Sequence, residues 1–258
     1  MPVPTFDEGP RAAQAQRLPV CGVPLLDNLE ADLEALRAAC EAFAGRSIVY
    51  LCNPNNPTGT VVSSADLREW VLGAPDTFFL LDEAYVDFVT DPRILPEDAW
   101  VREGLPNVTT LRTFSKLHGL AGLRVGYSLS APAQAQKWAA YSSDLPANTL
   151  GLLAARASLA DTEFQQRSRE TVLASRAAIT GTLQRLGLRY AAPNGNFVFY
   201  ELPAWAGTNS DFRERMHALH IRVGRDFTPY ERWNRLSTGT AEETAHVTAV
   251  LTELLSQA

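Results

Sequence analysis

The sequence predicts an α/β fold, with a mostly parallel sheet in a large domain and a small α+β domain behind it. Up to about residue 130, short β-rich runs alternate with helical ones, the pattern of parallel strands joined by crossover helices. From 132 to 186 the chain becomes helical and rich in Ala, Leu and Arg, with a break around 144–146. We therefore expect a large domain over 1–145, bridging helices over 146–187 and a small domain over 188–258.

In the large domain, β-rich runs predict strands at 20–24, 47–52, 77–82, 108–114 and 124–129. The run Asp27-Asn28-Leu29-Glu30 has the spacing of a capping box and predicts a helix start, with Leu33, Leu36 and Ala39 on its apolar face. A second, weaker helix start is predicted at 63–66. In the small domain we expect strands at 189–191, 196–201 and near Ile221 and Arg235, and helices near 210–219 and after Thr240.

Composition excludes several classes of protein. The chain has 258 residues, 46% of them hydrophobic, which suffices for a real core. A net charge of −6 argues against a nucleic-acid partner, which would require a basic face. No apolar stretch approaches the roughly 20 residues of a membrane span. The opening residues lack the basic start and apolar centre of a signal peptide. Cys21, Cys40 and Cys52 suggest buried thiols in a reducing compartment, so we expect a cytoplasmic protein.

Polar side chains follow several predicted strands at the point where each ends. Asn53-Pro-Asn-Asn-Pro-Thr-Gly-Thr60 comes after the apolar run 48–52, and Asp82 closes the run 79–82. Lys116 follows the strand at 108–114, and Arg124 lies just beyond it. Open α/β sheets bind ligands at the carboxyl ends of their strands. A lysine for a Schiff base, an acid for a pyridine nitrogen and an arginine for a phosphate describe a pyridoxal-phosphate site.

Taken together, the segments NPNNPTGT, DEAYVDF and RTFSKLHGLAGLRVGY resemble the fold-type I pyridoxal-phosphate enzymes, and among them the histidinol-phosphate aminotransferase-like branch. The segments 194–198 and 235–240 are similar to the C-terminal part of that family. The resemblance runs from about residue 2 to the end and implies the type I transferase fold. Family members have a substantial N-terminal portion before the stretch that 3–6 resembles, so we expect this chain to lack it.

The resemblance implies roles for the lysine and the acid. Lys116 would form the Schiff base with pyridoxal 5'-phosphate and then move the proton between the substrate and the cofactor. Asp82 would pair with the protonated pyridine nitrogen. Four apolar residues before Asp82 also fit the metal-binding strand of a P-loop ATPase, but the chain has no matching glycine-rich loop. The remaining alternative is that Asp82 merely ends a strand.

The resemblance also assigns the cofactor's other contacts. Asn56 and Tyr85 match the pair that hydrogen-bonds its phenolic oxygen, although the Asn-Pro-rich loop is also a stiff turn and Tyr85 could be a core aromatic. Thr113, Ser115 and Arg124 match the phosphate cup, with Thr113 alternatively a strand-end residue. The family completes this cup with the N-terminal portion.

For the substrate, Arg235, together with Asn56, matches the group that binds the α-carboxylate. Asn196 has a structural alternative at the entrance to the small domain. His217 and His220 have helical spacing but no further ligands, so no metal is predicted.

The predicted function is a PLP-dependent aminotransferase that moves an α-amino group between an amino acid, such as histidinol phosphate or an aromatic amino acid, and a 2-oxo acid. One alternative is a decarboxylase of a phosphorylated amino acid. The other is a catalytically impaired remnant without the N-terminal portion. The resemblance implies a homodimer. It also implies that a lost strand would pair with 124–129, leaving an association-prone edge near Val125 and Leu129.

Overall fold

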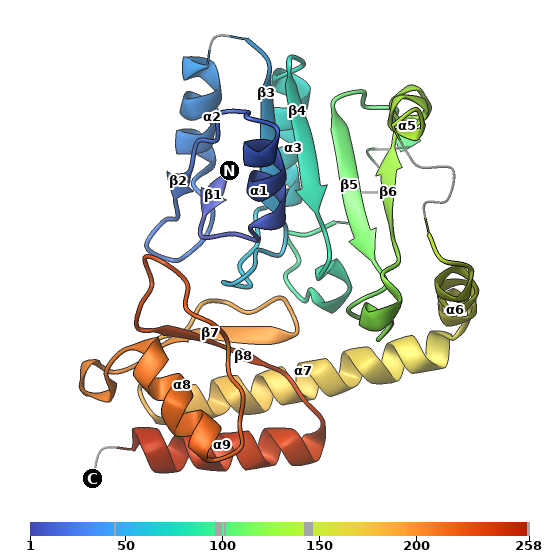
Figure 1. Ribbon diagram of the computed structural model, residues 1–258. Coiled ribbons are helices and arrows are strands. Elements are labelled where there is room, and N and C mark those ends of the chain that lie inside the picture. The colour runs from blue at the N-terminus through green and yellow to red at the C-terminus, as the bar shows by residue number, and fades with distance from the viewer. Residues whose placement is uncertain (44, 96–99, 101, 142–146, 257–258) are drawn as a thin grey trace.

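A four-stranded sheet forms the upper part of the molecule (Figure 1), and the expected α/β class is confirmed. The computed structural model describes all residues except 44, 96–99, 101, 142–146 and 257–258. The strand order is β3-β4-β5-β6, with β3 (Ser47–Cys52), β4 (Thr77–Asp82) and β5 (Val108–Thr113) parallel. The last strand, β6 (Gly126–Ser130), is antiparallel to β5. Within the described chain it is the outermost strand on its side, as expected.

The core of this sheet is formed by its apolar strands and the helices α2 (Leu33–Ala42) and α3 (Ser64–Gly73). Phe79 and Leu81 of β4 are fully buried. Trp70 of α3 meets the Phe79 ring edge-on, with the ring centroids 5.0 Å apart. The neighbouring Phe78 points to the opposite face, where it packs on Trp138. The alternation along β4 therefore buries Phe79 and Leu81 fully on one face of the sheet and covers Phe78 only partly on the other.

We expect Phe79→Ala to lower the free energy of unfolding by about 3–5 kcal/mol, because it removes a fully buried ring and leaves a cavity. Urea denaturation followed by circular dichroism measures the change. Phe78→Ala is the matched control on the partly exposed side of the same strand and should cost clearly less. Equal losses in the two variants would contradict this account of the core.

The two predicted helix starts had different outcomes. The start at 63–66 is confirmed, because Ser63 caps α3 by accepting the backbone N–H of Asp66. The capping box at 27–30 is wrong. Asn28 instead accepts the N–H of Glu30 at 3.0 Å, and Leu29 has a left-handed φ of 66°, which no helix can continue through. Helix α2 begins later, with Asp32 accepting the N–H of Ala35 at 2.9 Å.

Strand boundaries agree for β3 and β4 and differ elsewhere. The strand expected at 20–24 is shorter in the structure, where only β2 (Val23–Pro24) forms and pairs in parallel with β1 (Pro2–Val3). The helix α1 (Glu8–Ala15) lies between β1 and β2 in the chain. The strand expected at 124–129 begins two residues later, because Arg124 has a left-handed φ of 53° after the short helix η2 (Ala121–Leu123). Val125 is buried but lies before the strand.

Helices connect the sheet to a smaller C-terminal unit. They are α5 (Pro132–Ala139), α6 (Thr149–Ala160) and the long α7 (Thr162–Arg185), which runs beneath the sheet in Figure 1. The break expected at 144–146 lies outside the described residues. The unit contains the antiparallel pair β7 (Phe197–Glu201) and β8 (Trp233–Ser237), with α8 (Asn209–Ala218) and α9 (Ala241–Leu255). Two short helices, η1 (Val86–Phe88) and η3 (Ala204–Ala206), are also present.

Two of the expected small-domain strands differ from the structure. Residues 189–191 form only an isolated bridge, Tyr190 to Tyr200. In the part of the chain that the structure describes, no strand includes Ile221. Its N–H closes the end of α8 on the carbonyl of Met216 at 2.9 Å, and its side chain packs against the core of this unit. This hydrogen bond to the preceding helix thus takes the place of the strand pairing that was expected at Ile221.

The buried Arg176 joins the C-terminal unit to the sheet. From α7 it donates to the carbonyl of Phe88 at 3.1 Å and to the Thr90 hydroxyl at 2.9 Å. It also donates to the carbonyl of Gly195 at 3.4 Å, so it links the segment after β4 to the residues just before β7. Among the described helices, none has the length and apolar character needed to cross a bilayer.

Candidate active site

The predicted functional residues meet where the sheet faces the C-terminal unit. Figure 1 shows β4 and β5 pointing toward β7 and β8, so their carboxyl ends open onto the boundary between the two. Asn56 and Lys116 come from the segments that follow β3 and β5, and Asp82 is the last residue of β4. Arg235 enters from the opposite side, on β8.

Lys116 lies in a tight turn after β5, in which the N–H of Gly119 donates to the Lys116 carbonyl at 3.1 Å. Its side chain is half-buried, and the ammonium nitrogen is 4.9 Å from the centroid of the Tyr85 ring. No carboxylate forms an ion pair with Lys116 among the residues for which coordinates are described. The amine is therefore held by an aromatic face and is not neutralised by a salt bridge.

Asp82 ends β4 with both carboxylate oxygens hydrogen-bonded. Oδ2 accepts from the hydroxyl of Tyr50 at 3.0 Å, and Oδ1 accepts from the N–H of Ala84 at 3.1 Å. Burial raises the pKa of the Asp82 carboxyl, while the two hydrogen bonds and the positive charge of Lys116 oppose that rise. Two donors fix the plane of the carboxylate, and each oxygen keeps a lone pair for a further partner.

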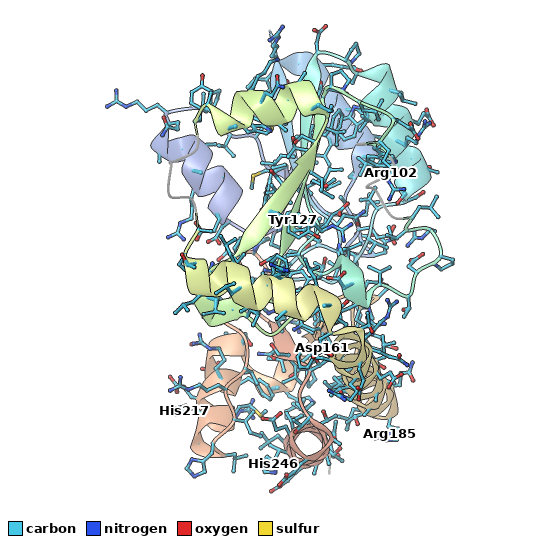
Figure 2. All side chains as sticks on the ribbon, turned by 90° about the vertical axis from the view of Figure 1, so that its right-hand side faces the viewer. Arg102, Tyr127, Asp161, Arg185, His217 and His246 are labelled. Atoms are coloured by element: carbon cyan, nitrogen blue, oxygen red, sulfur yellow. The ribbon has the colours of Figure 1, made fainter. Side chains whose placement is uncertain are left out.

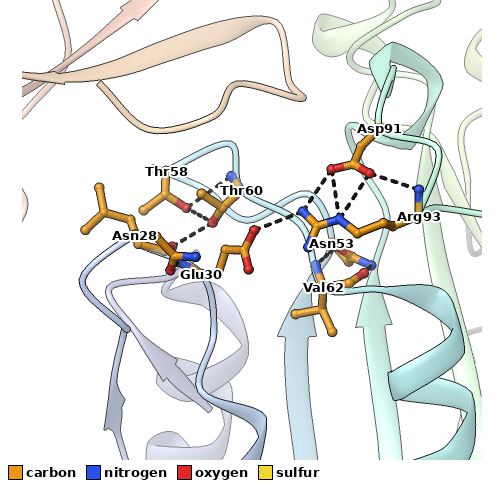
Figure 3. Close-up of polar contacts among 9 residues, drawn as sticks. Asn28, Glu30, Asn53, Thr58, Thr60, Val62, Asp91 and Arg93 are labelled. Carbon is orange, nitrogen blue, oxygen red and sulfur yellow. Dashed lines mark hydrogen bonds and ion pairs between the residues drawn. The ribbon is translucent and has the colours of Figure 1, made fainter. Parts of the chain in front are cut away.

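The loop that bears Asn56 is rigid, and Figure 3 shows part of its support. Asn53 pairs with Val62 through both of its amide atoms, at 3.1 and 3.0 Å, and the hydroxyls of Thr58 and Thr60 are 2.7 Å apart. Gly59 has a φ of 77°, and a Cβ there would lie 3.3 Å from the backbone of Pro193. The loop can approach the C-terminal unit this closely only because this position has no side chain.

Arg235 contacts Asn56 directly: its Nη1 donates to the Asn56 Oδ1 at 2.5 Å. The guanidinium also lies over the rings of Phe197 and Phe227, 5.2 and 5.6 Å from their centroids. Its Nε is buried and finds no hydrogen-bond acceptor among the described residues. Burial lowers the pKa of Arg235, but an arginine remains charged. A cation with an unused donor, held between aromatic rings, fits an anionic ligand such as a carboxylate.

The three residues assigned to the phosphate cup also come together. Thr113 donates through its hydroxyl to that of Ser115 at 3.0 Å, and the Ser115 N–H donates back to Thr113 at 3.1 Å. The exposed Arg124 reaches the Ser115 hydroxyl at 3.5 Å and the carbonyl of Ala121 at 2.8 Å. Two hydroxyls beside a guanidinium are a donor set that suits a phosphate dianion. The left-handed turn at Arg124 is what returns its side chain to Ser115.

The remaining candidates also make contacts within the fold. The Tyr85 ring packs edge-on against Phe197, with the ring centroids 5.0 Å apart, and the Lys116 amine lies over its face. The Asn196 carbonyl accepts from the N–H and hydroxyl of Thr238, at 2.9 and 3.0 Å. Figure 2 shows His217 in the lower part of the molecule, with α8. No group of three or more metal-binding side chains occurs within the described chain.

Tyr50 was not predicted, although it touches Asp82. The strand pattern contained the signal. Tyr50 and Cys52 are two residues apart and so share one face of β3, and Cys52 is paired in register with Asp82. A second unpredicted contact is the ion pair of Arg112 with the fully buried Glu83. It ties β5 to the segment after β4 beside the site.

The profile of the family described as "Aminotransferase class I and II" matches residues 1–251. The chain belongs to this aminotransferase family. The family depends on pyridoxal phosphate. The resemblance expected from the motifs and the type I transferase fold are thereby confirmed.

Individual relatives point to one branch of these aminotransferases. Histidinol-phosphate aminotransferase 2 of Ralstonia nicotianae is 37% identical over 233 residues, which are 88% of this chain and 60% of the relative. A solved protein from Erwinia carotovora atroseptica, proposed to be a histidinol-phosphate aminotransferase, has a TM-score of 0.93 at 37% identity, over 96% of this chain and 71% of that one.

A third relative was solved with the cofactor. The histidinol-phosphate aminotransferase from Sinorhizobium meliloti, in complex with pyridoxal-5'-phosphate, has a TM-score of 0.84 at 28% identity, over 97% of this chain and 68% of that one. The present chain spans about 60% of the length of the first curated relatives it matches.

Proposed function

We propose that this chain binds pyridoxal 5'-phosphate and transfers an α-amino group between an amino acid and a 2-oxo acid. The observation that supports this best is the convergence of Lys116, Asp82 and the Arg235–Asn56 pair, from four separate segments, on the carboxyl edge of the sheet. An amine, an acid beside it and a cation for a carboxylate are the groups that amino-group transfer requires. We further propose that 1–145, 146–187 and 188–258 act as large domain, bridge and small domain around this edge.

Each residue has a role toward the cofactor, which supplies an electron sink for the substrate α-carbon when it is bound. Lys116 binds its aldehyde carbon and moves the proton to and from the substrate. Asp82 keeps the proton on the ring nitrogen. Asn56 and Tyr85 donate to the phenolic oxygen, and the hydroxyls and guanidinium of the cup bind the phosphate, as the cluster of Thr113, Ser115 and Arg124 supports.

The proposed substrates are small: an amino acid or amino alcohol, with histidinol phosphate or an aromatic amino acid as candidates, and a 2-oxo acid as acceptor. Curated relatives carry the name histidinol-phosphate aminotransferase, which favours amino-group transfer over decarboxylation. We also propose a homodimer in the cytoplasm. No metal and no nucleic acid are part of the proposal.

A half-reaction tests the proposal. The protein is loaded with the cofactor, freed of excess and mixed, in separate samples without any acceptor, with histidinol phosphate, phenylalanine or a phosphorylated amino acid. Amino-group transfer yields one equivalent of the carbonyl product per bound cofactor and no carbon dioxide. Release of carbon dioxide from the phosphorylated amino acid would support the decarboxylase alternative, and the absence of any product from all three would support the impaired-remnant alternative.

Replacing Arg235 by glutamine should raise KM for the 2-oxo acid by about a hundredfold, because an Arg–carboxylate contact worth a few kcal/mol is lost. Histidinol phosphate carries a phosphate ester where amino acids have a carboxylate, and this anion is also a partner for the Arg235 guanidinium. Steady-state kinetics measure KM for the 2-oxo acid in wild type and variant. An unchanged KM would contradict the carboxylate role of Arg235.

A further inference from the structure

Behind Asp82 lies a short chain of hydrogen-bonding groups that ends in the interior of the sheet. The hydroxyl of Tyr50 donates to the Asp82 Oδ2 at 3.0 Å, and the thiol of Cys52 lies 3.4 Å from the same hydroxyl oxygen. The register explains the contact. Tyr50 pairs with Leu80 and Cys52 with Asp82, so all four side chains share one face of two neighbouring parallel strands.

The ring of Tyr50 is held in one position. It is 8% exposed, and Gly9 of α1 lies directly over it: a Cβ at Gly9 would stand 3.1 Å from three ring atoms. Only glycine allows the helix to approach the ring this closely. The hydroxyl therefore has a fixed direction, toward Asp82. Burial raises the pKa of the phenol, so it remains a donor throughout the physiological range.

We propose that Tyr50 is a positioning residue for the cofactor: its hydroxyl holds the Asp82 carboxylate ionised and aimed at the pyridine nitrogen. The inference rests on the proposed function and adds a residue to it. The Ala84 N–H fixes the other carboxylate oxygen at 3.1 Å, so Asp82 is held from two directions. A buried carboxylate favours its neutral form unless donors oppose the loss of solvent. Tyr50 is the side-chain donor that opposes protonation of Asp82. The hydrogen bonds from Tyr50 and Ala84 use one lone pair of each carboxylate oxygen, so a second lone pair on each remains to accept from the protonated ring nitrogen.

The variant Tyr50→Phe removes only the hydroxyl and keeps the ring under Gly9. In cofactor-free protein labelled with ¹³C-aspartate, the Asp82 resonance, assigned with Asp82→Asn, should titrate at a higher pH in Tyr50→Phe than in wild type. The sign follows because a donor lost from the charged form favours protonation. Cofactor affinity should fall about tenfold, as expected for one hydrogen bond to a charged group.

Tyr190→Phe is the matched control. Its hydroxyl accepts a hydrogen bond from Gln184 at 2.6 Å in the C-terminal unit, away from Asp82. It should leave the Asp82 titration and the cofactor affinity unchanged. An Asp82 midpoint in Tyr50→Phe equal to that of wild type would overturn the proposal, as would a shifted midpoint with unchanged cofactor affinity.

Two further measurements keep the test decisive. Should Tyr50→Phe fail to fold, 3-fluorotyrosine placed at position 50 retains the ring and makes the hydroxyl a stronger donor. The Asp82 midpoint must then fall, and a rise or no change overturns the proposal. A wild-type protein that never attaches the cofactor would overturn the proposed function, and the role of Tyr50 toward the ring nitrogen with it, whatever the Asp82 midpoint does.

Discussion

The variant Lys116→Ala is expected to lose covalent cofactor attachment and all turnover, with its fold intact. Lys116 lies in a half-buried turn, and its amine contacts the face of Tyr85 without an ion pair among the described residues. Its removal therefore breaks no salt bridge that stabilises the fold. What disappears is the amine that binds the aldehyde and moves the proton. Borohydride reduction followed by peptide mass spectrometry should place the label on Lys116 in wild type and on no side chain in the variant.

The chain offers a sharp control, because it contains only two lysines, Lys116 and Lys137. Lys137 is exposed on α5. Lys137→Ala should keep the label, the absorption band of the bound cofactor and the turnover of wild type. A label that stays in Lys116→Ala and is lost in Lys137→Ala would show that the cofactor attaches to Lys137 and that the assignment to Lys116 is wrong. Unchanged turnover in Lys116→Ala would exclude its role in proton transfer.

The sheet could be predicted from sequence because its signals are local. The runs 47–52 and 77–82 are apolar, of strand length and ended by a polar residue, and both match β3 and β4. The helix start at 27–30 failed because the chain turns through a left-handed residue at Leu29, which the four-residue pattern does not reveal. The strand near Ile221 failed for another reason. A hydrogen bond to Met216 closes the preceding helix instead of joining a ladder.

The site was predictable to a lesser degree, because its contacts join distant parts of the chain. The resemblance pointed to Asn56 and Arg235, but their contact spans 179 positions and depends on how the C-terminal unit packs on the sheet. Thr113, Ser115 and Arg124 were nearer in sequence and easier to group. Tyr50 was not predicted as a site residue, because an aromatic side chain in an apolar strand is usually part of the core. Only the register of β3 with β4 shows that its hydroxyl reaches Asp82.

Replacing Asp82 by asparagine is expected to lower kcat for amino-group transfer on the order of a thousandfold, the usual cost of losing a placed electrostatic group. The amide keeps the size of the carboxylate but has one acceptor oxygen where Asp82 has two. That oxygen can still accept from the Ala84 N–H, and the new amide nitrogen can donate to the Tyr50 oxygen in place of the bond Tyr50 now donates. The local structure therefore survives, and the lost activity reports the lost charge.

The charge matters because a protonated ring nitrogen needs an anion beside it. Without that anion, the pKa of the nitrogen falls and the ring withdraws electrons from the α-carbon less well. Spectra of the bound cofactor as a function of pH measure the fall, and single-turnover rates measure its effect on proton transfer. Asp76→Asn, exposed just before the other end of β4, removes the same charge far from the site and should retain wild-type rates. Wild-type rates in Asp82→Asn would mean that the ring nitrogen works unprotonated in this protein. The donors around Asp82 would then serve the fold and not the cofactor.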